Sequence, residues 1–255
     1  MSNHCNIVSR ETHHKPPTLD IFLNNVFVVT MFHVKHRLPP YETLVDYLLE
    51  RNHRVNLTAI RSKDDAMIKH VEDSLILSDY INLAHSRARL AIEIGTGAGF
   101  PGLVVAKECP QLNITLLDSV EKKVRFVRDA IPLMALTNVI AVTDRAESFA
   151  STHLNSFDIV IARSVARLNV LLEYASPLLK IGGVLLAMKM ADITEELAVA
   201  KAAAPILGFD FSSSLPYALL NQSRTIFCFK KTTASSISLP RHIGIAAHNP
   251  ERGRF

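Results

Sequence analysis

The sequence has few cysteines, and none of them are spaced in pairs. Cys5, Cys109 and Cys228 lie far apart in a chain of 255 residues. This spacing excludes a disulfide framework or a cysteine-based zinc site, and it suits a reducing compartment. The eleven histidines are also scattered along the chain. We therefore expect no metal centre and a cytoplasmic location.

The sequence also lacks an apolar run long enough to cross a membrane. The nearest candidate, residues 21–32, is interrupted by Asn24 and Asn25. Two acidic residues, Glu11 and Asp20, argue against a signal peptide. Hydrophobic residues still make up 48% of the chain, which is enough for a sizeable core. The composition predicts a folded protein with no membrane partner.

The most informative segment is a glycine-rich run at residues 93–102, which joins two apolar stretches. The order predicts a strand, a glycine turn and a helix. Glycines adopt positive φ and let the backbone approach a ligand closely, here at Gly95, Gly97 and Gly99. The helix start adds unpaired N–H groups. The segment therefore predicts a nucleotide-type cofactor site.

Two cofactors fit this glycine spacing. Gly97, Gly99 and Gly102 match the dinucleotide fingerprint, whereas Gly95, Gly97 and Gly99 directly after Glu93 match an S-adenosylmethionine loop. A carboxylate is poorly placed beside a pyrophosphate and well placed beside an ammonium or sulfonium group. We therefore favour S-adenosylmethionine, with an NAD(P)-dependent oxidoreductase as the alternative. An acid such as Asp118, which ends the next predicted strand, binds ribose hydroxyls in either case.

Apolar stretches and helical stripes alternate after residue 90, which predicts an α/β fold with a mostly parallel sheet covered on both faces. We expect strands at 90–94, 113–117, 138–143, 157–162 and 183–188 and helices near 101–109, 120–136, 168–179 and 194–204. Two more strands, Phe209–Ser213 and Thr225–Phe229, are expected to form an antiparallel hairpin with a long loop. A mostly parallel sheet with an antiparallel strand at its end is typical of methyl-transferring enzymes, so we expect a Rossmann-like class I S-adenosylmethionine-dependent methyltransferase fold with seven strands.

The flanking segments divide the chain further. Residues 41–50 and 64–80 have helical spacing of apolar residues, which predicts a small N-terminal helical cap. We expect a poorly structured N-terminal extension at 1–37, a helical cap at 38–86, a cofactor-binding methyltransferase domain at 87–232 and a basic C-terminal tail at 233–255.

Polar residues at the carboxyl ends of the predicted strands are the candidates for chemistry. Ala146 and Glu147 follow the third strand, where a backbone amide and a carboxylate can bind the adenine edge. Arg163 ends the fourth strand, near the expected methyl-transfer point. An ion pair with a neighbouring acid is the competing interpretation of Arg163.

Missing motifs indicate the methyl acceptor. The Asp/Asn-Pro-Pro-aromatic motif of enzymes that methylate base amines is absent after the fourth strand, and no cysteine is placed to act as a nucleophile for carbon methylation. The remaining acceptor is one that is already nucleophilic, such as guanine N7, which has a lone pair and no proton to remove. Such a reaction needs positioning more than a general base.

Several segments together resemble the bacterial RsmG (GidB) family. They are residues 56–61 and 70–75, the glycine run at 93–102, residues 116–119 and 122–126, and positions 145–147, 157–158, 163 and 188–189. The resemblance implies a cytoplasmic enzyme that methylates guanine N7 of 16S ribosomal RNA with S-adenosylmethionine. It also implies cofactor contacts at Gly95, Phe100, Ala146, Glu147 and Arg163.

Basic residues predict the RNA-binding surface, because phosphates are bound by lysine and arginine. We expect RNA contacts from residues of the cap, of the segment after the second strand, of the fifth strand and of the C-terminal part: Arg61, Lys122, Lys123, Arg125, Lys189, Arg224 and Arg241. Asn56 and His70 are weaker candidates, since hydrogen bonding within the cap is the slightly better explanation of both. The expected partner is 16S ribosomal RNA or a small-subunit assembly intermediate, bound by a monomer. A non-catalytic RNA-binding or assembly factor is a further alternative.

Overall fold

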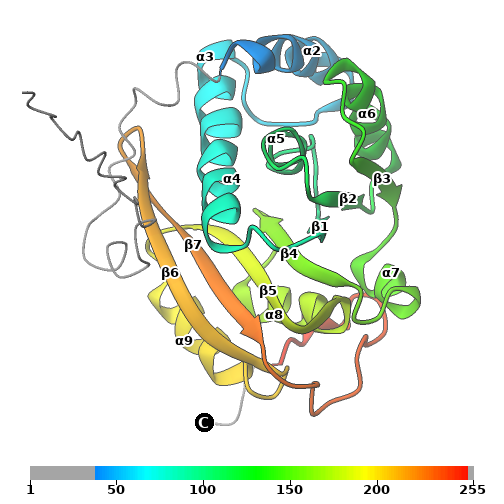
Figure 1. The fold of residues 1–255 in the computed structure, drawn as a ribbon, viewed down its shortest axis with the longest axis vertical. Coiled ribbons are helices and arrows are strands. Elements are labelled where there is room, and N and C mark those ends of the chain that lie inside the picture. Colours follow the sequence, from blue (N-terminus) through cyan, green and yellow to red (C-terminus); the bar gives the residue numbers. More distant parts are fainter. Residues whose placement is uncertain (1–37, 252–255) are drawn as a thin grey trace, which may run out of the picture.

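A seven-stranded sheet with helices on both faces forms the body of the protein (Figure 1). The computed structural model describes residues 38–251, so the extension predicted at 1–37 lies outside the described residues. The strand order is β3-β2-β1-β4-β5-β7-β6. Neighbouring strands are parallel from β3 to β5, whereas β7 is antiparallel to both β5 and β6. The mostly parallel sheet predicted from the alternating pattern is therefore confirmed.

The strands occur where apolar runs are flanked by turns. Their bounds are β1 Leu90–Ile94, β2 Asn113–Asp118, β3 Val139–Thr143, β4 Phe157–Arg163, β5 Leu179–Met190, β6 Phe209–Leu219 and β7 Gln222–Lys231. The central strands are buried on both faces, as parallel strands beneath helices must be. In β4, Ile159 and Ile161 join the core on one face of the sheet, and Val160 joins the core on the other.

Helices precede the sheet and then connect its strands. Their bounds are α2 Pro39–Val55, α3 Lys63–Ala66, the π-helix η2 Met67–Glu72, α4 Asp73–Ala84, α5 Gly102–Glu108, α6 Glu121–Leu133, α7 Ala146–Thr152, α8 Leu168–Leu178, α9 Thr194–Ala203 and α10 Ile245–His248. The short helix α7, which begins three residues after the end of β3, is not among the helices predicted from the sequence.

The helices before β1 pack into the same core as the sheet. Tyr41, Leu44 and Leu48 of α2 are fully buried and belong to the cluster that contains Leu103 of α5. Tyr47 stacks on Phe126 of α6 with ring centroids 5.2 Å apart. The cap therefore has a fixed position over the α5 and α6 face of the sheet.

The predicted long loop of the final hairpin is wrong. Strands β6 and β7 extend much further than expected and are joined by Leu220 and Asn221 alone. Burial alternates along much of β6, as expected for an edge strand with one covered face. Polar residues of β6 and Pro216 looked like a loop in the sequence, but an edge strand tolerates proline because one side needs no hydrogen-bond donor.

Candidate functional site

The glycine loop leaves the carboxyl end of β1 and enters α5. Its three predicted glycines all have positive φ, with values of 68° at Gly95, 58° at Gly97 and 84° at Gly99. A Cβ atom at Gly97 would meet only the Gly95 carbonyl oxygen, 4.0 Å away, among the described atoms. The backbone at Gly97 is therefore open to close approach by a ligand.

Glu93 lies beneath this loop and ties it to α5. Its Oε2 accepts hydrogen bonds from Thr96 Oγ1 at 2.6 Å and from the Gly102 N–H at 3.1 Å. Glu93 is only 1% exposed. Burial raises the pKa of Glu93 to about 7, although the hydrogen bond from Thr96 opposes this shift.

The second oxygen of Glu93 discriminates between the two candidate cofactors. Oε1 is buried and has no hydrogen-bond partner within residues 38–251. A nearby cation would stabilise this carboxylate. A pyrophosphate would need the N–H groups at the start of α5, and Glu93 already occupies the Gly102 N–H with negative charge. The site therefore fits a cationic cofactor better than a dinucleotide.

Asp118, at the carboxyl end of β2, contacts the glycine loop directly. Its Oδ2 accepts the Gly97 N–H at 2.9 Å, and its Oδ1 accepts the Val120 N–H at 2.9 Å. Each oxygen keeps a second lone pair for another donor. Asp118 thus fixes the loop from the position where the sequence analysis expects ribose hydroxyls.

Ala146 and Glu147 form the first turn of α7, next to the carboxyl end of β3. Both are largely buried, with 9% and 8% exposure. The Glu147 Oε1 atom accepts the N–H of Gly244 from the C-terminal part of the chain at 2.9 Å. The sequence analysis did not anticipate this contact between residues 97 positions apart.

Arg163 ends β4 and points into the interface with the cap. Its Nη1 donates to Asp73 Oδ2 at 2.9 Å and to the Lys69 carbonyl at 3.0 Å. Asp73, at the first position of α4, is fully buried. The ion pair that competed with a functional interpretation of Arg163 is therefore present, on the same sheet edge as the glycine loop.

Asp73 is shared by three partners. Besides Arg163, its carboxylate accepts hydrogen bonds from Arg224 Nη1 at 3.0 Å and from the Tyr217 hydroxyl at 2.7 Å. These partners come from β7 and β6. Burial, followed by the charge of Asp73, raises the pKa of Tyr217, so its hydroxyl stays protonated as a donor. The cap, β4 and the final hairpin thus meet at one buried carboxylate.

His70, in the π-helix, connects Arg163 to the glycine loop. Its ring stacks on Phe100 with centroids 4.9 Å apart and an interplanar angle of 18°. Its Nδ1 lies 3.1 Å from Arg163 Nη2, and its Nε2 lies 3.0 Å from Thr58 Oγ1. Burial, then the charges of Arg163 and Arg224, lower the pKa of His70 to about 3. The ring is therefore neutral, with Nδ1 accepting from Arg163.

The sequence analysis missed Asp73 and Tyr217 and weighed His70 mainly as a cap residue. Asp73 lies off the apolar stripe of the predicted helix at 64–80, which includes Val71 and Leu75, so the sequence pattern does not indicate that it is buried. Once buried, its carboxylate needs a cation as partner. Asn56, by contrast, ends α2 in the left-handed conformation with a φ of 53°, and its Oδ1 accepts from Arg61 at 3.3 Å, which matches capping within the cap.

The predicted RNA-binding residues fall into two groups. Arg61, Lys122 and Arg125 are exposed and Lys123 is partly exposed. The others form internal ion pairs: Lys189 with Glu196 at 2.6 Å, Arg224 with Asp73 at 3.0 Å and Arg241 with Glu173 at 2.5 Å. Lys189 and Arg224 still share the sheet edge of the glycine loop, whereas Arg241 lies against α8.

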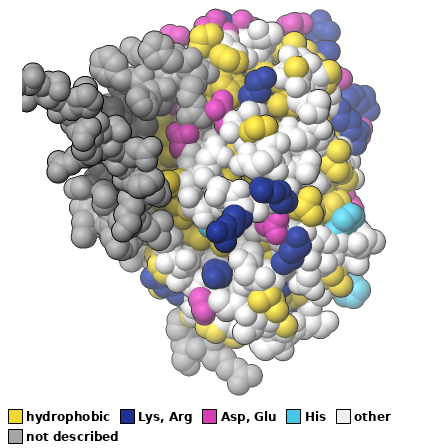
Figure 2. Space-filling model, in the orientation of Figure 1, with side chains coloured by type: hydrophobic (Ala, Val, Ile, Leu, Met, Phe, Trp, Pro, Cys, Tyr) yellow, Lys and Arg dark blue, Asp and Glu magenta, His cyan; other side chains and the backbone are white. Residues whose placement is uncertain are grey.

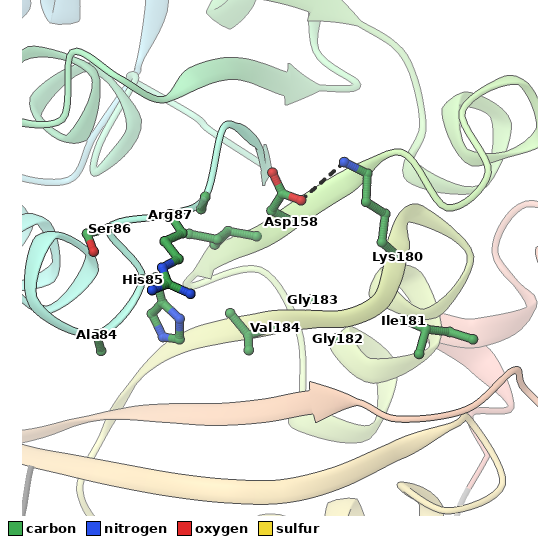
Figure 3. Close-up of a pocket in the computed structure, with 12 residues that line it drawn as sticks. Ala84, His85, Ser86, Arg87, Asp158, Lys180, Ile181, Gly182, Gly183 and Val184 are labelled. Carbon is green, nitrogen blue, oxygen red and sulfur yellow. Dashed lines mark hydrogen bonds and ion pairs between the residues drawn. The ribbon is translucent and has the colours of Figure 1, made fainter.

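A hollow of about 590 Å³ opens at the opposite edge of the sheet, at the amino ends of β4 and β5 (Figure 3). Its lining includes His85, Arg87 and the Asp158–Lys180 ion pair, whose charged atoms are 3.1 Å apart. Figure 2 shows several lysine and arginine side chains near the middle of the face that is also seen in Figure 1. Ligands of doubly wound sheets bind at the carboxyl ends of strands, so this hollow is not the cofactor site.

Between residues 38 and 251, none of the helices has the length and apolar character required to span a membrane. In the same part of the chain, no cluster of three or more histidine, cysteine, aspartate or glutamate side chains could hold a metal ion.

The sheet order, with a single antiparallel strand next to the edge, and the glycine loop after β1 define a class of protein. The fold is the Rossmann-like one of class I methyltransferases. A solved O-methyltransferase from Bacillus cereus, in complex with S-adenosylhomocysteine, shares it with a TM-score of 0.58 at 18% identity, over 80% of this chain and 97% of that one.

The particular family follows from the sequence as a whole. The family described as rRNA small subunit methyltransferase G matches residues 38–223, and this chain belongs to it. Two members carry the name ribosomal RNA small subunit methyltransferase G. The Leuconostoc citreum protein is 34% identical and covers 91% of this chain and 99% of its own length. The Caldicellulosiruptor bescii protein is 41% identical and covers 82% of this chain and 89% of its own length.

Proposed function

We propose that this protein transfers the methyl group of S-adenosylmethionine to N7 of a guanine in 16S ribosomal RNA. The observation that carries the choice of cofactor is the buried Glu93 carboxylate at the first N–H of α5, with one oxygen free of partners within residues 38–251. Family membership supports the choice of a small-subunit RNA substrate. Action in the cytoplasm as a monomer, on free RNA or on an assembly intermediate, is part of the proposal.

The carboxyl edge of the sheet would hold the cofactor. Gly95, Gly97 and Gly99 shape the loop with their positive φ, and Gly97 would give the open backbone for the methionine part, above the carboxylate of Glu93. Asp118 would bind the ribose hydroxyls with its remaining lone pairs, and Ala146 with Glu147 would bind the adenine edge. Residues 87–232 thus serve as the cofactor domain, and the cap at 38–86 covers its site.

The cofactor supplies an electrophilic methyl group, and the protein's contribution is positioning. Guanine N7 has an exposed lone pair, so the transfer requires no proton removal. His70, which could otherwise act as a base next to Phe100, is held neutral and occupied at both ring nitrogens. Phe100, stacked against His70, and Arg163 would form the wall of the transfer point.

The RNA would bind across the same edge. The exposed residues Arg61, Lys122, Lys123 and Arg125 are proposed as phosphate contacts. Lys189 and Arg224 are proposed as contacts close to the target base, where an incoming phosphate would compete with their ion pairs.

The experiment that tests this function maps guanine N7 methylation in 16S ribosomal RNA from cells with and without the gene. We expect one modified guanine to be lost with the gene and to be restored by the purified protein with S-adenosylmethionine on small subunits from the deletion strain. An unchanged map favours a non-catalytic RNA-binding factor. Calorimetric binding of a nicotinamide dinucleotide, with no binding of S-adenosylhomocysteine, favours the oxidoreductase.

A further inference from the structure

The C-terminal segment, defined here as residues 240–251, folds back across α7 and α8 (Figure 1). An arginine near its start is held by a two-pronged ion pair, in which Arg241 Nε and Nη2 donate to the two carboxylate oxygens of Glu173, each at 2.5 Å. Glu173 lies in α8 and its side chain is only 2% exposed. Paired geometry of this kind is among the stronger hydrogen-bonding arrangements in proteins.

The far end of the segment is fixed to the same helix. The Asn169 side chain of α8 donates to the Glu251 carbonyl at 2.9 Å, and Arg241 also donates to the Asn249 carbonyl at 2.9 Å. Ala246, in the middle of the segment, is 1% exposed. Both ends and the centre of the segment are thus tied to the body of the protein.

Between these attachments the segment reaches the first turn of α7. The Gly244 N–H donates to Glu147 Oε1 at 2.9 Å, from a backbone with a φ of 85° that favours glycine. The Glu147 side chain can adopt several rotamers, and the hydrogen bond from Gly244 selects one of them. It leaves Oε2 of Glu147 as the oxygen that can accept from a ligand.

We propose that the C-terminal segment is a positioning element of the adenine subsite. Glu173 and Arg241 hold the segment so that Gly244 fixes one oxygen of Glu147 and directs the other toward the exocyclic amine of the adenine. The inference rests on the proposed function, because it takes S-adenosylmethionine as the cofactor. It assigns to Arg241 a role inside the protein in place of a contact with RNA.

The test compares two ligands by calorimetry: S-adenosylhomocysteine and S-inosylhomocysteine, in which a carbonyl replaces the exocyclic amine. Wild-type protein is expected to prefer the adenine compound by about tenfold or more, as a hydrogen bond to a charged group allows. Arg241→Ala is expected to reduce this preference by at least threefold, whereas Arg241→Lys, which keeps one ion pair, restores part of it. Lys180→Ala, which breaks an ion pair at the opposite edge of the sheet, is the matched control and keeps the full preference.

A purely structural role would weaken both ligands equally, so an unchanged preference in Arg241→Ala overturns the inference. If Arg241→Ala does not fold, Glu173→Gln replaces it with the same expected loss of preference. In a Glu147→Gln background the Arg241 substitution should add nothing, because Arg241 acts through Glu147; an additive effect contradicts the inference. Absence of S-adenosylhomocysteine binding to the wild-type protein is a different result, which overturns the proposed function and this inference with it.

Discussion

Asp73 and Arg163 form an ion pair in which Oδ2 and Nη1 are 2.9 Å apart and the aspartate is fully buried. The pair connects the start of α4 in the cap to the end of β4, next to the glycine loop. Because Arg224 and Tyr217 share the same carboxylate, one acidic group is the common counter-ion of two arginines. Besides its apolar packing, the cap is therefore tied to this edge of the sheet by one buried carboxylate.

The first prediction concerns the loss of that charge. In Asp73→Asn, Tyr217 can still donate to the amide oxygen, but Arg163 and Arg224 are left without a counter-ion. Removing one member of a buried ion pair is expected to lower the free energy of unfolding by about 3 kcal/mol. Urea denaturation measures this change.

An exposed ion pair in the cap provides the control for Asp73→Asn. Asp46 pairs with Lys63 at 2.9 Å, and its side chain is 59% exposed. Asp46→Asn should hardly change the free energy of unfolding, because water already solvates both partners. Equal effects of the two substitutions would show that Asp73 does not organise the interface.

The second prediction separates cofactor approach from backbone strain. Gly97 and Gly182 have positive φ, 58° and 91°, and a Cβ would meet no described atom closer than 4.0 Å at Gly97 and none within 4 Å at Gly182. Alanine at either position should cost about 1 kcal/mol of stability. Only Gly97→Ala should weaken S-adenosylhomocysteine binding, by tenfold or more, because the added methyl group fills the space beside the backbone that the cofactor would occupy.

Calorimetry on both alanine variants measures this difference. Gly182 is the matched control, since it lies at the amino end of the sheet with the same kind of backbone strain. If Gly97→Ala binds the ligand as tightly as Gly182→Ala, the loop does not contact the cofactor.

The sequence predicts best those elements whose conformation depends on neighbouring residues, such as the first strand and the glycine loop. The first strand was predicted at 90–94 and is found at Leu90–Ile94, because a short apolar run before a glycine turn has few alternatives. The hairpin was predicted too short, since packing of an edge strand decides whether Pro216 belongs to it. The glycine loop likewise has its conformation encoded in three residues, Gly95, Gly97 and Gly99.

The contacts around Arg163 and Glu147 could not be predicted in the same way. Arg163 meets Asp73 across 90 positions, and Glu147 meets Gly244 across 97 positions. These distances in sequence are closed only by the packing of the cap on the sheet and of the C-terminal segment on α8. A buried acid requires a nearby cation, but the sequence pattern indicates neither the burial of Asp73 nor which arginine is its partner.

The third prediction concerns RNA binding. Lys122 and Lys123 lie in the first turn of α6, at the carboxyl edge of the sheet. Replacing both with alanine should weaken binding to small subunits, whatever the base sequence of the RNA. The slope of log affinity against log salt concentration should fall by about one for each lost phosphate contact. Filter binding at several salt concentrations measures this slope.

The control for the lysine pair comes from the opposite edge of the sheet. Arg87→Ala combined with Lys180→Ala removes two basic side chains around the amino-edge hollow. This double variant should keep both the affinity and the salt slope. A larger effect of this double variant than of the Lys122 and Lys123 substitutions would place the RNA at the amino edge of the sheet and contradict the proposed binding surface.

The fourth prediction is a pH dependence of stability that originates at Glu93. Its pKa is about 7 in the folded protein and 4.5 when unperturbed, so the folded state binds the proton more tightly than the unfolded state. The stabilisation from this proton is complete below pH 4.5 and is lost as the pH rises through about 7. A shift of this size corresponds to about 3 kcal/mol, at about 1.4 kcal/mol per pKa unit.

Glu93→Gln keeps the oxygen acceptor for Thr96 and Gly102 but cannot ionise. The unfolding free energy of the wild type should therefore fall relative to that of Glu93→Gln between pH 5 and pH 8, as urea denaturation at each pH would measure. Titration of His70 contributes equally to both proteins and cancels in the difference. Parallel pH curves would contradict the raised pKa. A cationic cofactor favours ionised Glu93, so calorimetry in two buffers at pH 6.5 should detect release of a proton when S-adenosylmethionine binds the wild type, and a smaller release from Glu93→Gln.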